Sequence, residues 1–531
     1  MPDAPIALGR RTLLASASAL LALPRPGNAQ ISAGGNRMVI VLDYEPPTLV
    51  SLTNVATPAL TVSGKVTEGL LQYSETLDPE PELAASWEIA PDGLTYTFHL
   101  RQGVRWHDGR PFTSADVAFS IELLRKVHPR GRGTFANVTA IETPDAATAV
   151  LRLSRPAPYL IKALAASESP IVPRHIYEGT DPAANPNGNA PVGTGPFRFK
   201  EWVRGSHILY ERNPDYWVPG LPKLDQLVVR FIPDAASRSI AFETGAVDIG
   251  YRTPVALSDL ERLRQLPSLA FEPRGNSYSF NVTRLEFNLQ NAHFARPQLR
   301  QAIAHAIDRA VIARTVYYGY ATICHSPIAP GLAQFHDPAP TPYPYDPRAA
   351  ERLLDAAGYP RGADRVRLRL TLDYNPIGSD TRRLADYIRA ALSRVGIAVE
   401  VRSQDLSSFI RRVYTDRDFD FTLNGASNLF DPTVGVQRLY WSKNRIKGVP
   451  FSNGTWYHNP RVDELLETAA VENDPARRVA LFREFQQIVA AEVPDLNLVQ
   501  PTFLTIHNRR VTDHSLTANG IESNLARARV V

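Results

Sequence analysis

The stretch "AASWEIAPDGLTYTFHLRQGVRWHDGRPFTSADVAFS", residues 84–120, places two strands, a tight turn and a helix in close succession. The dipeptide "DG" at 92–93 is a hairpin turn signal, and apolar residues alternate with polar ones over 95–100. Thr113, followed three residues later by Asp116, is typical of a helix N-terminus. A hairpin followed directly by a helix predicts an α/β or α+β protein with several sheets.

A second stretch, "APVGTGPFRFKEW" at 190–202, raises the question of a phosphate site because it contains Gly193 and Gly195. A phosphate cradle needs glycines that lead into a helix N-terminus, whose amides and dipole hold the anion. Here the glycines lead into alternating Phe197 and Phe199, a strand pattern. We therefore expect a corner where two backbones pass closely, and no ligand cradle.

Strands and helices continue to mix along the rest of the chain. Strand patterns occur within 36–62, 137–153 and 197–232. Helices, several with Asn or Asp before Pro at their start, are predicted within 238–251, 297–316, 345–360, 381–401 and 459–494. The first and fourth of these segments are expected to end at a glycine and continue into a short strand.

Length and charge narrow the class of protein. A chain of 531 residues is too long for one core, and roughly three units of 100–200 residues are expected. A formal net charge of +4, with no block of like charges, gives no indication of a nucleic-acid partner.

The N-terminus predicts export. Arg10 and Arg11 precede an apolar run over 13–23, and Gly27 and Ala29 occupy the −3 and −1 positions of a cut before residue 30. We expect a signal peptide over 1–29, of the twin-arginine or the Sec type. No cysteine follows it to take a lipid, so a freely soluble periplasmic protein is expected.

Motifs for chemistry are missing from the sequence. It has no GxSxG, HExxH, CxxC, GxxxxGK[ST] or complete GxGxxG, and its twelve histidines show no paired metal spacing. Cys324 is the only cysteine, so no intrachain disulfide forms, and with nothing nearby to lower its pKa we expect a buried, inert thiol. No catalytic residue, metal or cofactor is predicted.

Five collinear blocks together resemble one known family. They are residues 84–120, "VGTGPFRFKEW" with "ERNPDYW", "RQAIAHAIDR", "YDPRAAERLLDAAGYP" and "GTWYHNPRVDELLETA". The chain resembles the family 5 extracytoplasmic solute-binding proteins, the dipeptide-, oligopeptide- and nickel-type receptors of ABC importers. The resemblance covers nearly all of the chain after the signal peptide.

The resemblance implies a periplasmic-binding-protein-like α/β fold of two lobes, with an extra subdomain inserted in the first lobe. The lobe I core would comprise 30–62, 180–275 and 500–531, the inserted subdomain 63–179, and lobe II 276–499. Two hinge crossings would fall in "GNSYSFNVT" and "PDLNLVQPT".

The resemblance also implies a function. The protein would be a monomeric receptor that captures a peptide or peptide-like solute between two closing lobes and delivers it to ABC permease subunits in the membrane. It would not be an enzyme.

In peptide-binding relatives, an aspartate three residues before the acidic-Pro pair of lobe II holds the peptide's ammonium group. The equivalent residue before Asp431 is Asn428. An amide cannot neutralise a buried ammonium ion. We therefore expect the ligand not to be a short peptide with a free N-terminus, unless Asp431 or Glu45 takes over.

Other binding candidates come from position relative to the family: loop, hinge-strand and small lobe II residues, and one aromatic wall. The full set of ligand-binding candidates is Asn54, Val55, Tyr278, Asn281, Gly425, Ala426, Ser427, Asn428, Asp431 and Trp441.

Three alternatives remain open at this point. One is an exported hydrolase that uses the same cleft, which would need a nucleophile, base and acid assembled from distant residues. Another is a nickel- or haem-type binding protein, which no histidine cluster supports. The third is a docking or chaperone-like module with a permanently open groove.

Overall fold

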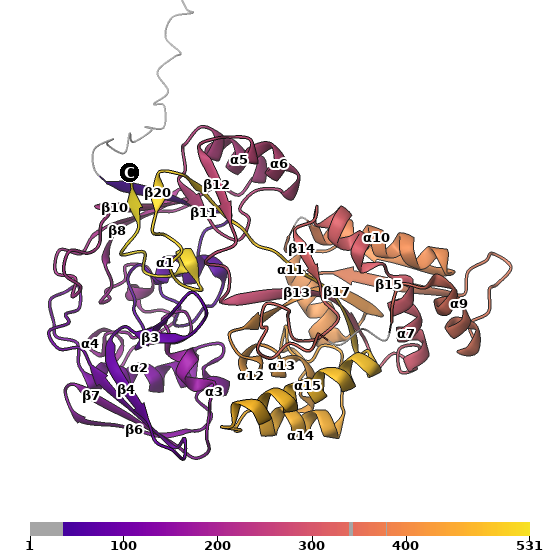
Figure 1. The fold of residues 1–531 in the computed structure, drawn as a ribbon, viewed down its shortest axis with the longest axis horizontal. Coiled ribbons are helices and arrows are strands. Elements are labelled where there is room, and N and C mark those ends of the chain that lie inside the picture. The colour runs from indigo at the N-terminus through magenta and orange to yellow at the C-terminus, as the bar shows by residue number, and fades with distance from the viewer. Residues whose placement is uncertain (1–35, 339–342, 379) are drawn as a thin grey trace, which may run out of the picture. The chain divides into compact units, whose positions relative to one another are not determined.

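Two large β-sheets and one smaller sheet organise the chain (Figure 1). The computed structural model describes residues 36–338, 343–378 and 380–531. The predicted signal peptide, 1–29, lies outside the described residues.

The first large sheet combines early segments with the C-terminal part of the chain. Its strands, in spatial order, are β12 (Leu269–Glu272), β19 (Thr505–Asn508), β11 (Ile249–Gly250), β1 (Arg37–Leu42), β10 (Gln226–Phe231), β9 (His207–Arg212) and β8 (Phe197–Val203). β1 runs parallel to both β10 and β11. The helices α1 (Thr57–Ser63), α5 (Ala235–Glu243) and α6 (Leu260–Arg264) and the short strands β20 (Val511–Thr512) and β21 (Arg529–Val530) complete this lobe.

A smaller antiparallel sheet is inserted between α1 and β8. Its order is β4 (Ala84–Ile89), β5 (Thr95–Leu100), β7 (Thr148–Leu153) and β6 (Val138–Asp145). The remaining elements here are β2 (Leu71–Tyr73), β3 (Pro79–Pro81), α2 (Ser114–Val127), α3 (Gly131–Thr134) and α4 (Arg174–Tyr177). The predicted hairpin with its turn at 92–93 is confirmed, and Thr113 and Asp116 form the capping box of α2.

The glycine corner is also confirmed. A Cβ added to Gly193 would lie 1.9 Å from the carbonyl O of Val66, and one added to Gly195 would lie 2.7 Å from the same atom. The Gly195 amide donates to that carbonyl at 2.9 Å. His107 braces the corner, because its Nε2 lies 2.8 Å from the Gly195 carbonyl O. Only glycine allows this backbone approach, so the stretch is part of the framework.

The second large sheet is built from the second half of the chain. Its order is β14 (Ala321–Ile323), β18 (Asp495–Pro501), β13 (Ser279–Phe287), β17 (Phe421–Leu429), β15 (Leu368–Tyr374) and β16 (Ile397–Arg402). Its helices are α7 (Pro297–Ala306), α8 (Arg309–Val311), α9 (Pro347–Ala356), α10 (Asp380–Arg394), α11 (Leu406–Ile410), α12 (Pro432–Gly435), α13 (Gln437–Tyr440), α14 (Pro460–Ala469) and α15 (Pro475–Glu492). α14 and α15 pack side by side (Figure 1).

The helix starts predicted at Asp346, Asn459 and Asp474 are confirmed, since each side chain accepts from backbone amides of the first turn. The single helix predicted over 297–316 is wrong. The chain leaves α7 at Ile307 in an extended conformation, and the Asp308 carboxylate then caps α8. An aspartate favours this cap because its oxygen satisfies amides that a helix start leaves unpaired.

The chain passes between the two large sheets twice, from β12 to β13 and from β18 to β19. Each sheet has its own apolar core, so the described chain forms two lobes, the first of which carries the inserted sheet. In the part of the chain that the structure describes, none of the helices combines the length and hydropathy that a membrane crossing requires.

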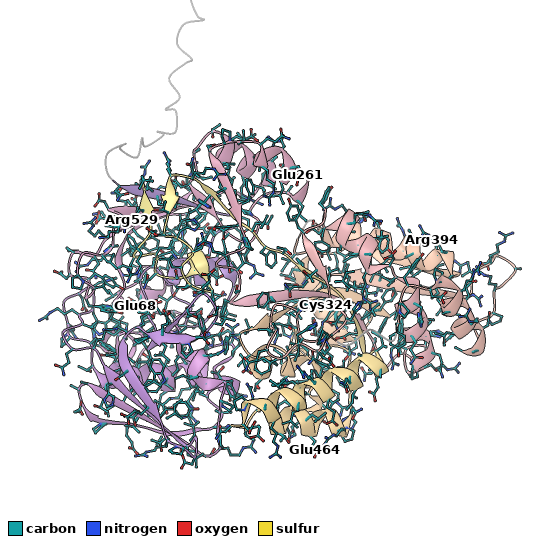
Figure 2. The ribbon with its side chains drawn as sticks, in the orientation of Figure 1. Glu68, Glu261, Cys324, Arg394, Glu464 and Arg529 are labelled. Carbon is teal, nitrogen blue, oxygen red and sulfur yellow. The ribbon has the colours of Figure 1, made fainter. Side chains whose placement is uncertain are left out.

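Cys324 lies in lobe II (Figure 2) and is fully buried. Burial raises the pKa of its thiol to about 12, and Sγ donates to the Ser326 carbonyl O at 3.1 Å. The predicted inert thiol is therefore confirmed.

Candidate functional site

A cavity of about 1650 Å³ is lined by residues of both lobes. On the lobe I side, Asp43 follows the end of β1 and Arg252 follows β11, two parallel neighbours. The carboxyl ends of parallel strands are where open α/β sheets place their ligands. Drug-sized ligands occupy pockets of roughly 300–1,000 Å³, so this cavity has room for a solute larger than one amino acid.

On the lobe II side, β13 and β17 form the floor of the cavity. The two strands are antiparallel neighbours, with Asn281 opposite Ser427 and Thr283 opposite Gly425. All four residues line the cavity. A Cβ on Gly425 would lie 2.7 Å from the Asn281 side-chain oxygen, so the glycine leaves room for that amide.

Alternate residues of β17 point to the other face of the sheet, because side chains of a strand alternate. Ala426 packs in the apolar core beneath, and Asn428 is fully buried, where its Oδ1 accepts from the Ala329 amide at 2.7 Å. Asp431 forms a bidentate ion pair with Arg478 at 2.7 Å. The cavity lining thus includes Gly425 and Ser427, while Ala426, Asn428 and Asp431 serve the interior of lobe II.

The loop before α1 contributes Val55 and Thr57 to the lining. The adjacent Asn54 uses its side-chain oxygen to accept from the Ala56 amide at 2.9 Å, which shapes this loop. Glu45 accepts from the Gly205 amide at 3.0 Å on lobe I. Neither Asn54 nor Glu45 is among the residues that line the cavity.

Tyr278 forms a buried wall at the first crossing between the lobes. Its hydroxyl donates to Glu168, which also binds the Arg130 guanidinium, and its ring packs against Phe430 at a centroid distance of 6.4 Å. Burial, reinforced by the charge of Glu168, raises the pKa of Tyr278 well above its ordinary value. Tyr278 and Arg130 line the cavity as a fixed pair, since Glu168 holds both.

Five arginines line the cavity with no carboxylate within ion-pair distance among the described residues: Arg132, Arg155, Arg238, Arg252 after β11 and Arg438 of α13. Arg438 donates to the Phe451 carbonyl. Burial, and then the charges of Arg130 and Arg284, lower the pKa of Arg438 to about 10. Arg438 is therefore a partly desolvated cation whose charge the protein does not compensate locally.

Arg252 is held in a strained loop. Both Arg252 and the β-branched Thr253 have positive φ, 53° and 56°, a conformation that costs energy and is often found at ligand sites. The Arg252 guanidinium carbon lies 4.1 Å from the Phe503 ring centroid. Thr253 and Leu504 exchange hydrogen bonds of 2.8 and 3.0 Å, which fix the loop to the second crossing.

Trp441 forms a half-buried aromatic part of the lining. Its indole Nε1 donates to Glu467 at 2.8 Å, and Lys443, 5.0 Å from the ring centroid, binds the same carboxylate at 2.6 Å. The ring is thus held in place from lobe II.

Glu522 is a nearly buried carboxyl at the lobe I wall. Burial raises its pKa to about 7, and its Oε2 has no hydrogen-bond partner among the described residues. The buried Lys65 lies nearby and donates to the Ser523 carbonyl O at 2.5 Å, and burial lowers its pKa to about 7.

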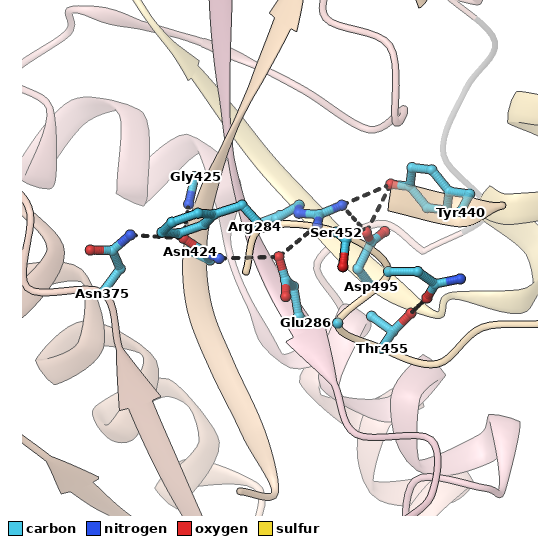
Figure 3. A network of polar contacts seen from close by, with 12 residues as sticks. Arg284, Glu286, Asn375, Asn424, Gly425, Tyr440, Ser452, Thr455 and Asp495 are labelled. Atoms are coloured by element: carbon cyan, nitrogen blue, oxygen red, sulfur yellow. Dashed lines mark hydrogen bonds and ion pairs between the residues drawn. The ribbon is translucent and has the colours of Figure 1, made fainter. Parts of the chain in front are cut away.

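A buried polar network lies under the floor of the cavity (Figure 3). Arg284 of β13 binds Asp495 of β18 at 2.7 Å and Glu286 at 2.6 Å, and Tyr440 donates to Asp495 at 2.8 Å. Burial raises the pKa of Asp495 to about 6, against the opposing charge of Arg284. Asn424, which lines the cavity, completes the network.

The network joins the two strands that carry the crossings, β13 and β18, to β17. A buried ion cluster of this kind is costly to break, because each charge left alone loses both water and partner. The floor of the cavity is therefore rigid relative to the lobe II core.

The comparison with protein families decides what this cavity belongs to. The model of the bacterial extracellular solute-binding proteins, family 5, matches residues 78–448, well over half of the chain. The protein is a family 5 solute-binding protein.

Three relatives illustrate the breadth of the family. The glutathione-binding protein GsiB of Escherichia coli O1:K1 is 27% identical over 454 residues, covering 84% of this chain and 85% of the relative. The binding protein AgaA from A. tumefaciens R10, solved with agropinic acid, is 28% identical, covers 93% and 99% of the two chains and has a TM-score of 0.75. DppA from Helicobacter pylori, solved with the peptide STSA, is 26% identical over 93% and 98%, with a TM-score of 0.79.

These findings confirm the predicted family and its two-lobe α/β fold. This solute-binding protein is the receptor component of an ABC importer: it binds a small solute and works with permease subunits. The comparisons support this function and not the hydrolase alternative.

The cavity of this solute-binding protein is lined by more basic than acidic side chains. Seven basic side chains line it, namely Arg130, Arg132, Arg155, Arg238, Arg252, Arg438 and Lys443. Four acidic side chains line it, namely Asp43, Asp380, Glu467 and Glu522. Arg130 and Lys443 have carboxylate partners, and Asp380 and Glu467 are themselves paired, so the unpaired charge within the described residues is strongly basic.

Reasoning from the sequence missed Arg130, Arg252, Arg438 and Glu522. No local pattern marks them, since each comes from a different element far from the others along the chain. The strand alternation of β17 was the one signal available: it separates Gly425 and Ser427 from Ala426 and Asn428.

Proposed function

We propose that this receptor captures a small peptide-like acid, with a carboxylate of the solute bound beside Arg438. One observation carries the proposal: the excess of basic side chains in the cavity that have no carboxylate within ion-pair distance. A solute carboxylate would supply the missing countercharge, and its ion pair with Arg438 would strengthen as water leaves the cavity.

Arg438 is the best placed of these cations. Burial, and then the like charges of Arg130 and Arg284, lower its pKa, and an incoming anion would relieve both costs. A planar guanidinium also binds a carboxylate through two parallel hydrogen bonds, which a lysine cannot do. The backbone groups beside Gly425 and the hydroxyls of Ser427 and Thr283 add polar contacts for an extended solute.

The names of relatives support this class of solute. GsiB is named for glutathione, a tripeptide that carries more carboxylates than amino groups, and AgaA was solved with agropinic acid. We therefore place the ligand of this chain among acidic peptides and amino-acid derivatives, and the nickel or haem alternative receives no support from the cavity.

Further features of the proposal concern the whole receptor. We propose that lobe I consists of 30–62, 180–275 and 500–531 with the insertion 63–179, and that lobe II spans 276–499. The protein would be an unlipidated, periplasmic monomer, exported by a twin-arginine or Sec signal over 1–29. It would release its solute unchanged, as a receptor and not an enzyme does.

Calorimetric titration tests the solute class. We expect glutathione, or a comparable acidic peptide from a panel, to bind, and its carboxyl ester to bind at least about tenfold more weakly. Replacing Arg438→Gln should weaken acid binding by roughly 10- to 150-fold, because a charged hydrogen bond contributes about 1.5–3 kcal/mol. Mass spectrometry after incubation should recover the solute unmodified.

Arg394→Gln, an exposed arginine of α10 (Figure 2), is the matched control and should leave affinity unchanged. Equal affinity for the acid and its ester, or an Arg438→Gln variant that binds as wild type does, contradicts the proposal. Appearance of a cleaved product would instead restore the hydrolase.

A further inference from the structure

One histidine cluster lies outside the cavity, at the edge of the lobe I sheet. Glu272, His507 and His514 each offer a ligand atom, and these atoms all lie within 4.8 Å of one another. Nε2 of His514 lies 3.3 Å and Nε2 of His507 3.7 Å from Oε1 of Glu272. The ring centroids of the two histidines are 4.2 Å apart.

Three separate segments bring these residues together. Glu272 ends β12 and His507 lies in β19, and the register of the two strands puts both side chains on one face as diagonal neighbours. His514 follows β20, after a turn in which Asp513 has a φ of 55°. Neither sequence spacing nor a motif marks the trio, since Glu272 is far from the histidines along the chain.

The orientation of the rings favours a cation. His507 Nδ1 lies 3.0 Å from the Asn508 carbonyl O, which can only accept, so Nδ1 holds the ring proton. In the neutral ring, Nε2 then presents its lone pair toward Glu272. Ser515 Oγ occupies Nδ1 of His514 at 2.8 Å, and the Nε2 of that ring also faces Glu272.

The Glu272 carboxylate is also oriented so that it can bind a cation. Arg274 donates to Oε2 of Glu272 at 2.8 and 2.6 Å, which orients the group and leaves Oε1 for another partner. That Oε1 is buried and accepts no hydrogen bond from any described residue. Two ring nitrogens and one carboxylate oxygen thus lie within 4.8 Å of one another around a common point.

The alternative explanation is an ion pair with a protonated histidine. His514 is only 4% exposed. Such a pair would place a ring N–H on Oε1 of Glu272, but that oxygen accepts no hydrogen bond from any described residue.

We propose that Glu272, His507 and His514 bind a divalent transition-metal ion, with Zn²⁺ as the best match. Ligands at about 2.1 Å from tetrahedral zinc lie roughly 3.4 Å apart, close to the separations from Glu272 Oε1 seen here. Two histidines and a glutamate are a known zinc ligand set that leaves a fourth position for water. Asn508, Ser515 and Arg274 supply the outer contacts that orient such ligands.

The position of the site suggests what the metal does. Glu272 lies just before the first crossing to lobe II and His507 just after the second, while His514 belongs to the C-terminal segment. A bound ion would join these three segments at the lobe I end of both crossings. It would stiffen the base of the pivot without entering the solute cavity, since none of its three ligands lines that cavity.

The test uses the protein purified without a polyhistidine tag, treated with chelator and dialysed. Calorimetric titration with ZnCl₂ should show one ion per chain, and Co²⁺ should give the visible absorption bands of a low-coordinate nitrogen–oxygen site. His507→Gln and His514→Gln should each weaken zinc binding at least about 100-fold, and Glu272→Gln at least about tenfold. Zinc should raise the melting temperature of the wild type and not of these variants.

His175→Gln is the matched control, because His175 faces a single carboxylate, Asp108, at 2.6 Å with no second histidine. It should bind zinc as wild type does. A readout that needs no variant is the proton NMR spectrum, in which two histidine ring signals should shift on zinc addition. Absence of stoichiometric zinc binding by the wild type, or equal loss in the His175→Gln control, overturns the proposal and leaves the trio as an ion pair.

Discussion

Glu522 and Lys65 show how burial changes charge at the lobe I wall. Both side chains are almost fully removed from water. Burial raises the pKa of Glu522 to about 7 and lowers that of Lys65 to about 7, and each charge only partly relieves the penalty on the other. The wall of the cavity is therefore close to a change of charge at neutral pH.

The first prediction concerns Glu522→Gln. The folded-state pKa of about 7 exceeds the ordinary 4.5, so between these values the folded chain keeps a proton that the unfolded chain has released. The contribution of Glu522 to stability is thus complete below about pH 4.5 and is lost as pH rises through 7. In urea unfolding, the free energy of unfolding of the wild type should fall by about 3 kcal/mol more than that of Glu522→Gln as the pH rises across this window.

Lys65 also has a pKa of about 7 that the Glu522 charge raises, so the slopes of the two curves are compared between pH 4.5 and 6, where Lys65 of the wild type is protonated in both states. Glu464→Gln, an exposed glutamate of α14 (Figure 2), is the control and should follow the wild-type curve. Parallel curves for wild type and Glu522→Gln would show that the carboxyl is ionised in the folded protein.

At the scale of elements, residues of β17 that line the cavity alternate with residues that stabilise the interior of lobe II. Gly425 and Ser427 are half-buried on the cavity face, and Ala426 and Asn428 are buried on the other. Over residues 425–428 the pleat sets this division, because a shift by one residue would exchange the two faces. Neighbours in the sequence thus have unrelated tasks.

We predict opposite effects for two adjacent substitutions. Asn428→Ala should lower the free energy of unfolding by about 1–3 kcal/mol, because the buried Ala329 amide loses its acceptor. Solute affinity should stay within about threefold. Ser427→Leu should leave stability within about 1 kcal/mol and weaken solute binding, because the larger side chain fills part of the cavity.

Denaturant unfolding and calorimetry on the same two variants measure both quantities. A large loss of affinity in Asn428→Ala with unchanged stability would mean that Asn428 contacts the solute directly, as the family pattern suggests. That result would also reverse the assignment of faces on β17.

Local rules were enough to predict most elements. The hairpin turn at 92–93, the Asp346, Asn459 and Asp474 caps and the glycine corner follow from backbone chemistry that acts within a few residues. The break of the helix at Ile307 was not predicted. The apolar stripe favours one continuous helix, but the Asp308 cap starts a new one. The sequence did not predict the roles of Arg252, Arg438 and the Glu272–His507–His514 trio, because only the tertiary fold brings these residues to their sites.

For the whole molecule, the two crossings between the lobes determine how solute binding changes the position of one lobe relative to the other. The Arg284 network ties β13 and β18 into lobe II, while Thr253 and Leu504 fix the second crossing to lobe I. The links 273–278 and 502–504 lie between these anchors. A solute that contacts both lobes stabilises the closed arrangement by the difference in its affinity for closed and open forms.

The last prediction follows from that linkage. Saturating solute should reduce the radius of gyration in small-angle scattering, because contacts to Arg252 on lobe I and to Arg438 on lobe II are both satisfied only when the lobes approach each other. Arg438→Gln should need roughly 10- to 150-fold more solute for the same decrease, in line with its loss of affinity. Since Arg394→Gln lies on the outer surface of α10, it should respond at wild-type concentrations. A radius that stays constant while calorimetry reports full occupancy would mean that the solute binds without moving the lobes, and the two crossings would then be rigid supports and not a pivot.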